Sequence, residues 1–362
     1  MISLDEPDDV RADERFDPER LRPVLADALP GATGPISVQQ FRKGHSNLTY
    51  LLRAGEREVV LRRAPFGVTV KSAHDMKREF TVLSALQRVY PKAPRPLAFC
   101  DDESVIGARF YLMERVRGVI LRSEAAPPGL AFTPDYLRAT STELVDTLAQ
   151  LHAVDVASAG LASFGHPEGY VERQVKGWTE RYFKAKTDEL PQVEEVAAWL
   201  ELNMPRESGA ALIHNDYKYD NVAFDPQEPT RIMAVLDWEM STVGDPLMDL
   251  GTSLGYWIDP EDPQEMRGHS YGPSFLPGSL SRVQFVERYA ERTGRAIGDA
   301  LFYYVYALFK IAVIVQQLYK RYRDGHTRDP RFGALIDWVR AVSRQAARAL
   351  DKGRIDHLGS GA

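Results

Sequence analysis

The hydrophobic period of the chain changes near residue 117, and this change constrains the fold more than any other sequence feature. Before that point, short apolar segments have the period of strands and are separated by Gly44 and Gly55, which suit turns. After it, apolar residues recur at three- and four-residue steps over long stretches, as they do in helices with one buried face. The pattern therefore predicts an α+β protein of two lobes, the first rich in strands and the second rich in helices.

The first lobe is expected to be small and to contain a five-stranded antiparallel sheet. Its strands are predicted at residues 36–41, 48–53, 58–63, 97–100 and 108–114, with one amphipathic helix at 74–89. The second lobe is expected to be larger and mainly helical. Its helices are predicted at residues 133–152, 174–186, 192–203, 281–293, 301–322 and 332–350.

These patterns divide the chain into three segments. Residues 1–30 are predicted to form an acidic leader and a short helix, residues 31–116 the first lobe, and residues 117–362 the helical lobe. The first 20 residues hold eight acidic residues against three arginines and contain no apolar run. They therefore predict a flexible leader rather than a signal peptide.

Composition and charge exclude several classes of protein. With 44% hydrophobic and 27% charged residues, the 362-residue chain has the composition of a globular protein. A formal net charge of −6 gives no positive field, so neither nucleic acid nor a membrane is expected as a partner. Cys100 is the only cysteine, which excludes an internal disulfide and favours a cytoplasmic protein. The apolar segment 301–322 contains Lys310 and Lys320, and it is predicted to be a buried core helix rather than a membrane span.

The chemistry is concentrated in two loops, each next to an apolar, strand-like segment. The first loop runs from His214 to Asn221, and the second begins at Asp237, where the segment 233–236 ends. Strands paired as a hairpin would bring Asp216, Asn221 and Asp237 into one small volume. Oxygen ligands and a carboxylate base in such an arrangement suit phosphoryl transfer to an alcohol.

Each of these side chains matches one task in that reaction. Asp216 is the predicted base for the attacking hydroxyl, and Lys218 is predicted to stabilise the transferring phosphoryl group. Asn221 and Asp237 are the predicted oxygen ligands of Mg²⁺. The alternatives from the residues alone are that Asp216 is a helix cap or surface acid and that Lys218 is a solvated lysine.

The order of these residues resembles a known superfamily. The H-x-D-x-x-x-x-N run at 214–221, followed by L-D-W at 236–238, is similar to the catalytic and metal loops of protein-kinase-like phosphotransferases. The G-D-P run at 244–246 is typical of the aminoglycoside phosphotransferase and choline kinase superfamily, and D-W-E stands where a protein kinase has D-F-G. The resemblance implies a bilobal protein-kinase-like fold, ATP and Mg²⁺ as cofactors, and a small-molecule acceptor.

The resemblance also assigns nucleotide-binding residues to the first lobe. They are Gly44, Ser46, Asn47, Val60, Arg62, Glu79, Met113, Glu114 and Val116. The first three lie in a loop whose glycine lets backbone amides approach the phosphates. The last three lie in the segment that would contact the adenine, with the Glu114 carbonyl and the Val116 amide at its edge.

Arg62 departs from the family pattern, because most relatives have a lysine there. Strand alternation places Val60 and Arg62 on one face and directs Arg63 toward solvent. Glu79, on the following helix, is the expected ion partner of Arg62. A guanidinium contacts phosphate through a fork rather than as a point charge, and activity is expected to be retained.

The residues around Gly44 and Asp237 look most like one branch of the superfamily, which is found elsewhere fused ahead of acyl-CoA dehydrogenase domains. By analogy, this favours a hydroxy acid or hydroxyacyl-CoA as the acceptor. Residues 253–362 hold 12 acidic and 16 basic residues, which favours a neutral or anionic acceptor. The open alternatives are an aminoglycoside, choline or homoserine-type kinase, and a nucleotide-binding pseudoenzyme that regulates a partner.

Other polar and aromatic residues of the second lobe have mainly structural interpretations. His214, Asp245 and Asp249 are expected to brace the catalytic loop or cap a helix. Tyr256 and Trp257 are candidates for lining the acceptor pocket. The Pro/Gly-rich stretch 259–277 is predicted to be a long exposed loop, either a substrate lid or a surface insertion.

Overall fold

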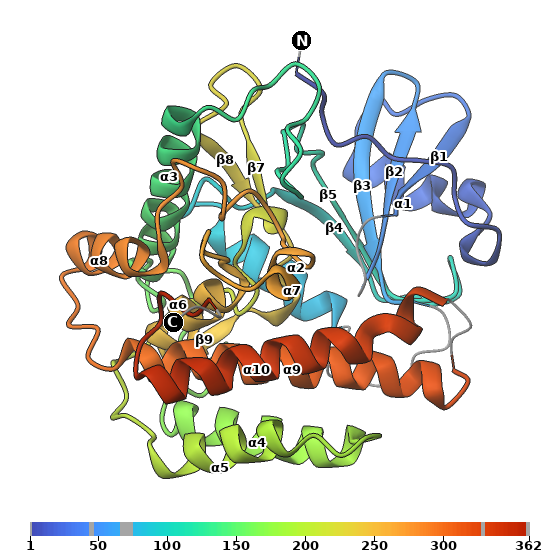
Figure 1. The fold of residues 1–362 in the computed structure, drawn as a ribbon. Helices are drawn as coiled ribbons and strands as arrows, with labels where there is room; N and C mark the ends of the chain where they lie inside the picture. Colours follow the sequence, from blue (N-terminus) through green and yellow to red (C-terminus); the bar gives the residue numbers. More distant parts are fainter. Residues whose placement is uncertain (1, 43–46, 66–74, 327–329, 360–362) are drawn as a thin grey trace. The chain divides into compact units, whose positions relative to one another are not determined.

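The chain folds into two compact units in a computed structural model that describes residues 2–42, 47–65, 75–326 and 330–359 (Figure 1). Unit 1 consists of Met1–Ile120, Ala157–Leu161 and Val222–Ser241. Unit 2 consists of Leu121–Val156, Ala162–Asn221 and Thr242–Ala362. The segment boundaries expected near residues 30 and 116 remain predictions.

Unit 1 is built on an antiparallel sheet, which has five strands within the described residues, in the order β1-β2-β3-β5-β4. The strands are β1 (Ile36–Phe41), β2 (Leu48–Ala54), β3 (Arg57–Arg63), β4 (Pro96–Cys100) and β5 (Phe110–Met113). Gly55 turns the chain between β2 and β3 with a φ of 60°, a conformation that glycine adopts without strain. Helix α2 (Met76–Leu86) begins at Asp75, whose side chain accepts a hydrogen bond from the Arg78 amide. The predicted five-stranded sheet and α+β class are confirmed.

The N-terminal segment packs on this sheet, so the prediction of a flexible leader is wrong. Asp8 exchanges two backbone hydrogen bonds with Gln40 of β1. The ring of Phe16 lies edge-on to Tyr50, with 5.1 Å between ring centroids. The short helices η1 (Ala12–Glu14), η2 (Pro18–Leu21) and α1 (Arg22–Ala28) follow one another and bury Leu21 and Leu25. A few apolar side chains thus order a segment whose acidic composition suggested disorder.

A later hairpin completes unit 1. Strands β7 (Val222–Phe224) and β8 (Ile232–Val235) pair with each other, and Phe224 also bridges to Val119. The Val235 amide donates to the Lys92 carbonyl at 2.7 Å. The turn η4 (Trp238–Met240) follows, and Trp238 is buried edge-on against Tyr90. Asp237 is therefore held by the same unit as the five-stranded sheet.

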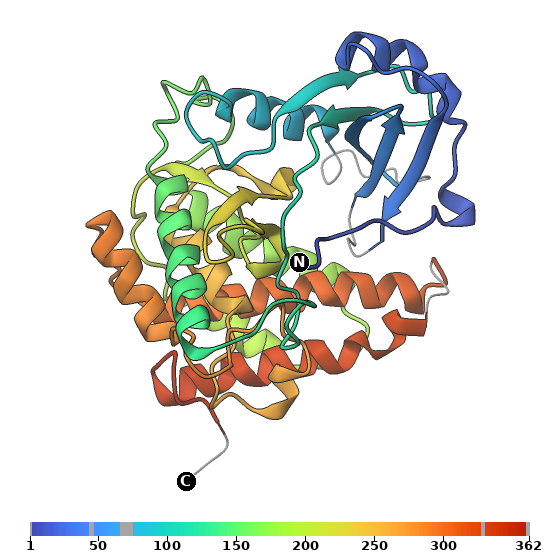
Figure 2. The same cartoon turned by 90° about the horizontal axis from the view of Figure 1, so that it is seen from above.

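Unit 2 is mainly helical. Its longer helices are α3 (Pro134–His152), α4 (Tyr170–Ala185), α5 (Pro191–Leu202), α6 (Pro246–Tyr256), α8 (Arg282–Thr293), α9 (Ala300–Arg323) and α10 (Leu335–Lys352). Helix α10 lies beside α9, and α8 lies beside α3, in both views (Figure 1, Figure 2). The short elements are β6 (Ala211–Ile213) paired with β9 (Thr242–Gly244), the turns η3 (Tyr219–Asn221) and η5 (Pro330–Ala334), and helix α7 (Gln264–Arg267).

Helix α9 is the centre of unit 2. It is long and apolar enough to cross a membrane, yet 78% of its most apolar window is buried inside the protein. Helices α4, α5, α6 and α10 all pack against it. A Cβ atom on Gly251 of α6 would lie less than 3.0 Å from the Tyr303 carbonyl of α9, so the two helices approach closely only because residue 251 is glycine. The structure thus uses α9 as the predicted core helix.

The stretch predicted as a long exposed loop, 259–277, is largely anchored instead. It contains α7 and buries Asp259, Asp262 and Ser274. Arg282, fully buried at the start of α8, pairs with Asp262 through two nitrogens at 2.5 and 2.7 Å. The proline and glycine content of the stretch indicated irregular backbone correctly, but it concealed the buried ion pair that anchors the segment.

Candidate active site

In unit 1, the predicted cation Arg62 lies among carboxylates. Its Nε is 3.3 Å from Glu79 Oε2, its Nη2 is 2.6 Å from Asp237 Oδ1, and Glu239 lies at 3.9 Å. Burial opposes the charge on Arg62, but Glu79 and Asp237 outweigh it and raise the pKa of the guanidinium. Burial also raises the pKa of Glu79, against the opposing effect of Arg62. The predicted ion pair between Arg62 and Glu79 is present.

The register of the sheet positions Arg62. Residue 62 pairs with Thr49 on β2 and with Tyr111 on β5. Its backbone is therefore fixed by a neighbouring strand on each side, because β3 is the central strand of the sheet. The expectation that Arg63 points to solvent is wrong, because Arg63 is fully buried and its Nη1 donates to the Ile106 carbonyl at 2.7 Å. Strand alternation did place the two arginines on opposite faces, but the N-terminal segment and the loop before β5 cover the second face.

The other predicted nucleotide residues fall in several places in unit 1. Val60 pairs with Met113 across β3 and β5, and both side chains are buried. Glu114 is exposed and its amide donates to the Arg95 carbonyl at 2.8 Å, while Val116 is half-buried. The Asn47 side chain donates to Glu239 at 2.6 Å. Gly44 and Ser46 lie outside the described residues.

In unit 2, the predicted catalytic loop begins at the end of β6 and is held by Asp249 of α6. The Asp249 carboxylate accepts the His214 amide at 2.7 Å and the Asn215 amide at 2.6 Å. Its Oδ2 also accepts Nε2 of His152 at 3.0 Å, and Nδ1 of that ring lies 2.6 Å from the Tyr289 hydroxyl. Burial alone would raise the pKa of Asp249, but these donors lower it. Asp249 braces the loop as predicted, and His214 contributes both its amide and its ring, whose Nδ1 accepts the Asp216 amide at 3.3 Å.

Asp216 lies at the centre of this loop and is tied to the two other predicted residues. Its Oδ2 accepts the Lys218 ammonium, and the Asn221 Nδ2 donates to the same oxygen at 2.7 Å and to the Asp216 carbonyl at 2.8 Å. Burial opposes ionisation, yet Lys218 outweighs it and lowers the pKa of Asp216. An ionised carboxylate beside an ammonium is the state that a proton acceptor needs.

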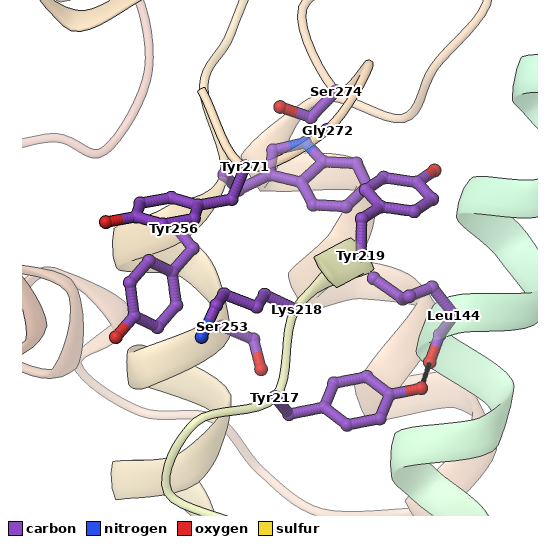
Figure 3. A pocket seen from close by; sticks show the side chains of 10 residues that line it. Leu144, Tyr217, Lys218, Tyr219, Ser253, Tyr256, Tyr271, Gly272 and Ser274 are labelled. Carbon is purple, nitrogen blue, oxygen red and sulfur yellow. Dashed lines mark hydrogen bonds between the residues drawn. The ribbon is translucent and has the colours of Figure 1, made fainter. Parts of the chain in front are cut away.

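A small pocket of about 10 Å³, enough for about one water molecule, lies beside Lys218, the ion partner of Asp216 (Figure 3). Its lining residues are Leu144, Tyr217, Lys218, Tyr219, Ser253, Tyr256, Trp257, Tyr271, Gly272 and Ser274. The Lys218 ammonium lies 4.7 Å from the ring centroid of Tyr256 and 5.5 Å from that of Tyr271. On another wall, Tyr219 stacks on Trp257 with 5.4 Å between centroids.

The pocket bears on two sequence predictions. Tyr256 and Trp257 line it as expected, and so do Tyr271, Gly272 and Ser274 of the 259–277 stretch, for which a substrate lid and a surface insertion were the two expectations. Sequence reasoning missed Tyr219 and Tyr271. Their only sequence signal is an aromatic residue inside a polar loop, which is not specific enough to assign a role.

Each unit offers one of the oxygen donors predicted for Mg²⁺, Asn221 in unit 2 and Asp237 in unit 1. Both Nδ2 contacts of Asn221 turn its amide nitrogen toward Asp216, so its carbonyl oxygen is directed away from that residue. Asp237 offers a partly exposed carboxylate. Among the described residues, no group of three or more His, Cys, Asp or Glu side chains is arranged to hold a metal. One or two protein oxygens completed by phosphate oxygens is the usual arrangement for Mg²⁺.

The five-stranded antiparallel sheet of unit 1 and the helices of unit 2 make up the fold of protein-kinase-like phosphotransferases. The chain belongs to the phosphotransferase enzyme family, whose family model matches residues 37–285. A structure from Ralstonia eutropha, provisionally named an aminoglycoside phosphotransferase, is 34% identical with a TM-score of 0.78. The match covers 93% of this chain and 99% of that one. A thermostable variant of another aminoglycoside phosphotransferase, solved with AMP-PNP and hygromycin B, shares the fold at 16% identity with a TM-score of 0.57, over 90% of this chain and 97% of that one.

Sequence relatives identify the branch. Acyl-CoA dehydrogenase family member 10 of Mus musculus is 36% identical over 296 residues, which is 81% of this chain and 27% of that protein. Family member 11 proteins match similarly, and the chain spans less than half the length of each of the first curated relatives. The predicted resemblance to the branch fused to acyl-CoA dehydrogenases is confirmed.

Proposed function

We propose that the protein transfers the γ-phosphoryl group of ATP, with Mg²⁺, to a hydroxyl of a small hydroxy acid or hydroxyacyl-CoA. The observation that carries this proposal is the ion pair of Asp216 with Lys218, whose side chain lines the aromatic pocket. Asp216 accepts the proton of the attacking hydroxyl, and Lys218 neutralises charge on the migrating group. The acceptor is a small molecule, with neither nucleic acid nor a membrane as partner, and the reaction takes place in the cytoplasm.

The pocket favours a neutral or anionic acceptor over a cationic one. None of its ten described lining residues is acidic. Aromatic rings attract cations, but here the Lys218 ammonium already lies over Tyr256 and Tyr271. A quaternary ammonium or a polycationic sugar would have to displace this ammonium, which is paired with Asp216, from the two rings. The choline and aminoglycoside alternatives are therefore less well supported than a carboxylate-bearing or thioester acceptor.

The residues of unit 1 support the nucleotide part of the proposal. Arg62 is paired with Glu79, as the cation of a kinase-like enzyme is, and its fork suits phosphate oxygens. Asp237 would supply an oxygen ligand for Mg²⁺, which would neutralise charge on the β- and γ-phosphates, and Asn221 of unit 2 is the second proposed ligand. The complex of the 16% identical relative with AMP-PNP supports an adenine nucleotide. The pseudoenzyme alternative rested on Arg62, and it is weakened because Arg62 keeps the expected acid partner.

The test is ATP-dependent phosphate incorporation, read by mass spectrometry, across hydroxy acids, hydroxyacyl-CoAs, amino alcohols and aminoglycosides. We expect transfer to a hydroxy acid or hydroxyacyl-CoA, and loss of it in Asp216→Asn. Asp220→Asn is the matched control, because Asp220 lies in the same loop but pairs with Arg122 at 2.5 Å. Transfer only to cationic acceptors would overturn the acceptor class. Full activity in Asp216→Asn would remove Asp216 from the role of base.

A further inference from the structure

Lys310 is a buried cation in the middle of core helix α9. Its side chain is only slightly exposed, with 2% relative accessibility for the residue. Within the described part of the chain, its ammonium forms no ion pair with a carboxylate. A lysine is seldom buried this deeply without an acidic partner, since burial of the charge is costly. The ammonium instead donates to the backbone carbonyl of Asn215 at 2.7 Å.

Asn215 precedes Asp216, so its backbone conformation sets the direction of the Asp216 side chain. It has a φ of 64°, the left-handed conformation that asparagine tolerates better than most residues. Three helices hold it: its amide donates to Asp249 of α6, its side-chain nitrogen donates to the Tyr170 hydroxyl of α4 at 3.0 Å, and its carbonyl accepts Lys310 of α9. That carbonyl belongs to the peptide bond between Asn215 and Asp216.

We propose that Lys310 is a positioning residue for the phosphoryl-transfer reaction, because its ammonium fixes the peptide plane that orients the Asp216 carboxylate. The inference rests on the proposed role of Asp216 as base. The amide of the same peptide, that of Asp216, donates to His214 Nδ1 at 3.3 Å, which is a long hydrogen bond. If the carbonyl is released, this weaker contact alone holds the peptide plane, while the Asp249 contact to the preceding amide persists. The Asp216 carboxylate would then lose its fixed orientation, while the fold of unit 2 would remain. A misplacement of about 1 Å costs on the order of 100-fold in turnover.

The charges around Lys310 make this contact sensitive to pH. Burial lowers the pKa of Lys310 to about 8. Asp216 of the loop and Asp249 of α6 oppose this effect, whereas Lys218 of the loop and Arg181 of α4 reinforce it. The ammonium is therefore lost on going from neutral to mildly alkaline pH. A neutral amine makes a weaker hydrogen bond to a carbonyl than an ammonium does.

The test compares Lys310→Met, Lys310→Arg and the control Lys320→Met, which changes an exposed lysine of the same helix that pairs with Asp324. Phosphate transfer is measured from pH 6 to 10, with kcat and KM for ATP separated. We expect Lys310→Met to lower kcat on the order of 100-fold with little change in KM for ATP. Lys310→Arg should keep most of kcat and should lose the alkaline decline near pH 8 that the unchanged protein shows, because a guanidinium stays charged.

Two results would overturn the inference. One is a folded Lys310→Met variant with unchanged kcat, and the other is an alkaline decline that persists in Lys310→Arg. If Lys310→Met does not fold, the pH profile of Lys310→Arg still decides. Failure of the underlying function is recognised separately, because Asp216→Asn would then retain transfer, or the unchanged protein would transfer nothing.

Discussion

Replacing Arg282 with methionine should destabilise unit 2 and weaken binding of the acceptor. The guanidinium is fully buried and pairs with Asp262 through two nitrogens, with Asp259 at 3.4 Å. It also donates to the Trp257 carbonyl at 2.9 Å and to the Ile355 carbonyl at 2.5 Å. Methionine fills much of the volume, but it leaves two buried carboxylates without their cation.

The expected loss in the free energy of unfolding follows from the two buried carboxylates that would lack a cation. Removing one partner of a buried ion pair typically costs about 3–5 kcal/mol, because the remaining charge stays desolvated. The same change at Arg354, whose pair with Asp356 at 2.6 Å is partly exposed, should cost less than about 1 kcal/mol. Arg354→Met is therefore the matched control. The comparison separates the loss of a buried pair from the loss of an arginine.

The assay is urea unfolding followed by tryptophan fluorescence, together with KM for the acceptor. Trp257, which lines the pocket, bonds Arg282 through its carbonyl, so both readouts should respond. A loss below about 1 kcal/mol in Arg282→Met, equal to that of Arg354→Met, would refute the reasoning. It would mean that water, or a shift of the 259–277 segment, solvates the charge of Asp259 and Asp262 after the arginine is removed.

Three further changes test other parts of the structure. Gly251→Ala should cost about 1–3 kcal/mol by thermal unfolding, because the new methyl group meets the Tyr303 carbonyl, and an unchanged midpoint would contradict that packing. Arg62→Lys should weaken Mg-ATP binding several-fold by calorimetry, since one ammonium cannot serve both Glu79 and Asp237 as the fork does; equal affinity would argue against the fork. Burial raises the pKa of Asp259 from 3.8 to about 6, so the folded protein holds this proton more tightly than the unfolded chain. The free energy of unfolding should therefore fall by at most about 3 kcal/mol as pH rises from about 4 to 6, and Asp259→Asn should remove that decline; an unchanged slope would exclude Asp259 as its source.

The fold was predictable where local pattern and burial coincide. The β2 and β3 strands alternate around a glycine turn, and α9 is apolar on most of its surface, so each was expected within one or two residues of its observed bounds. The failures share one cause. Arg63 is buried, and the N-terminal segment is packed on the sheet, by contacts between residues far apart in the chain, such as Phe16 with Tyr50. Periodicity carries no information about such contacts.

Part of the candidate site was predictable because three of its residues lie close together in the sequence. Asp216, Lys218 and Asn221 lie within six residues, so their spacing alone implied that they interact, and hydrogen bonds join them. Arg62 and Glu79 were paired through the resemblance. The role of Lys310 was not predicted, because a lysine in an apolar helix is usually expected on the exposed face of that helix. Only the packing of α9 brings it to the Asn215 carbonyl.

Unit 1 is made of three separate segments of the chain, so it cannot fold completely until the last of them has been synthesised. Its sheet is made early, but the last segment of unit 1, which contains the β7–β8 hairpin and the amide partner of the Lys92 carbonyl, is complete only at Ser241, about 120 residues after Ile120. At typical translation rates of about 5–20 residues per second, the nascent sheet waits roughly 6–24 s for that hairpin. During this interval Glu79 also lacks the Trp238 amide that it later accepts. A ribosome pause before residue 241 would therefore hold the first unit incomplete, and a chain cut near residue 120 would never acquire Asp237.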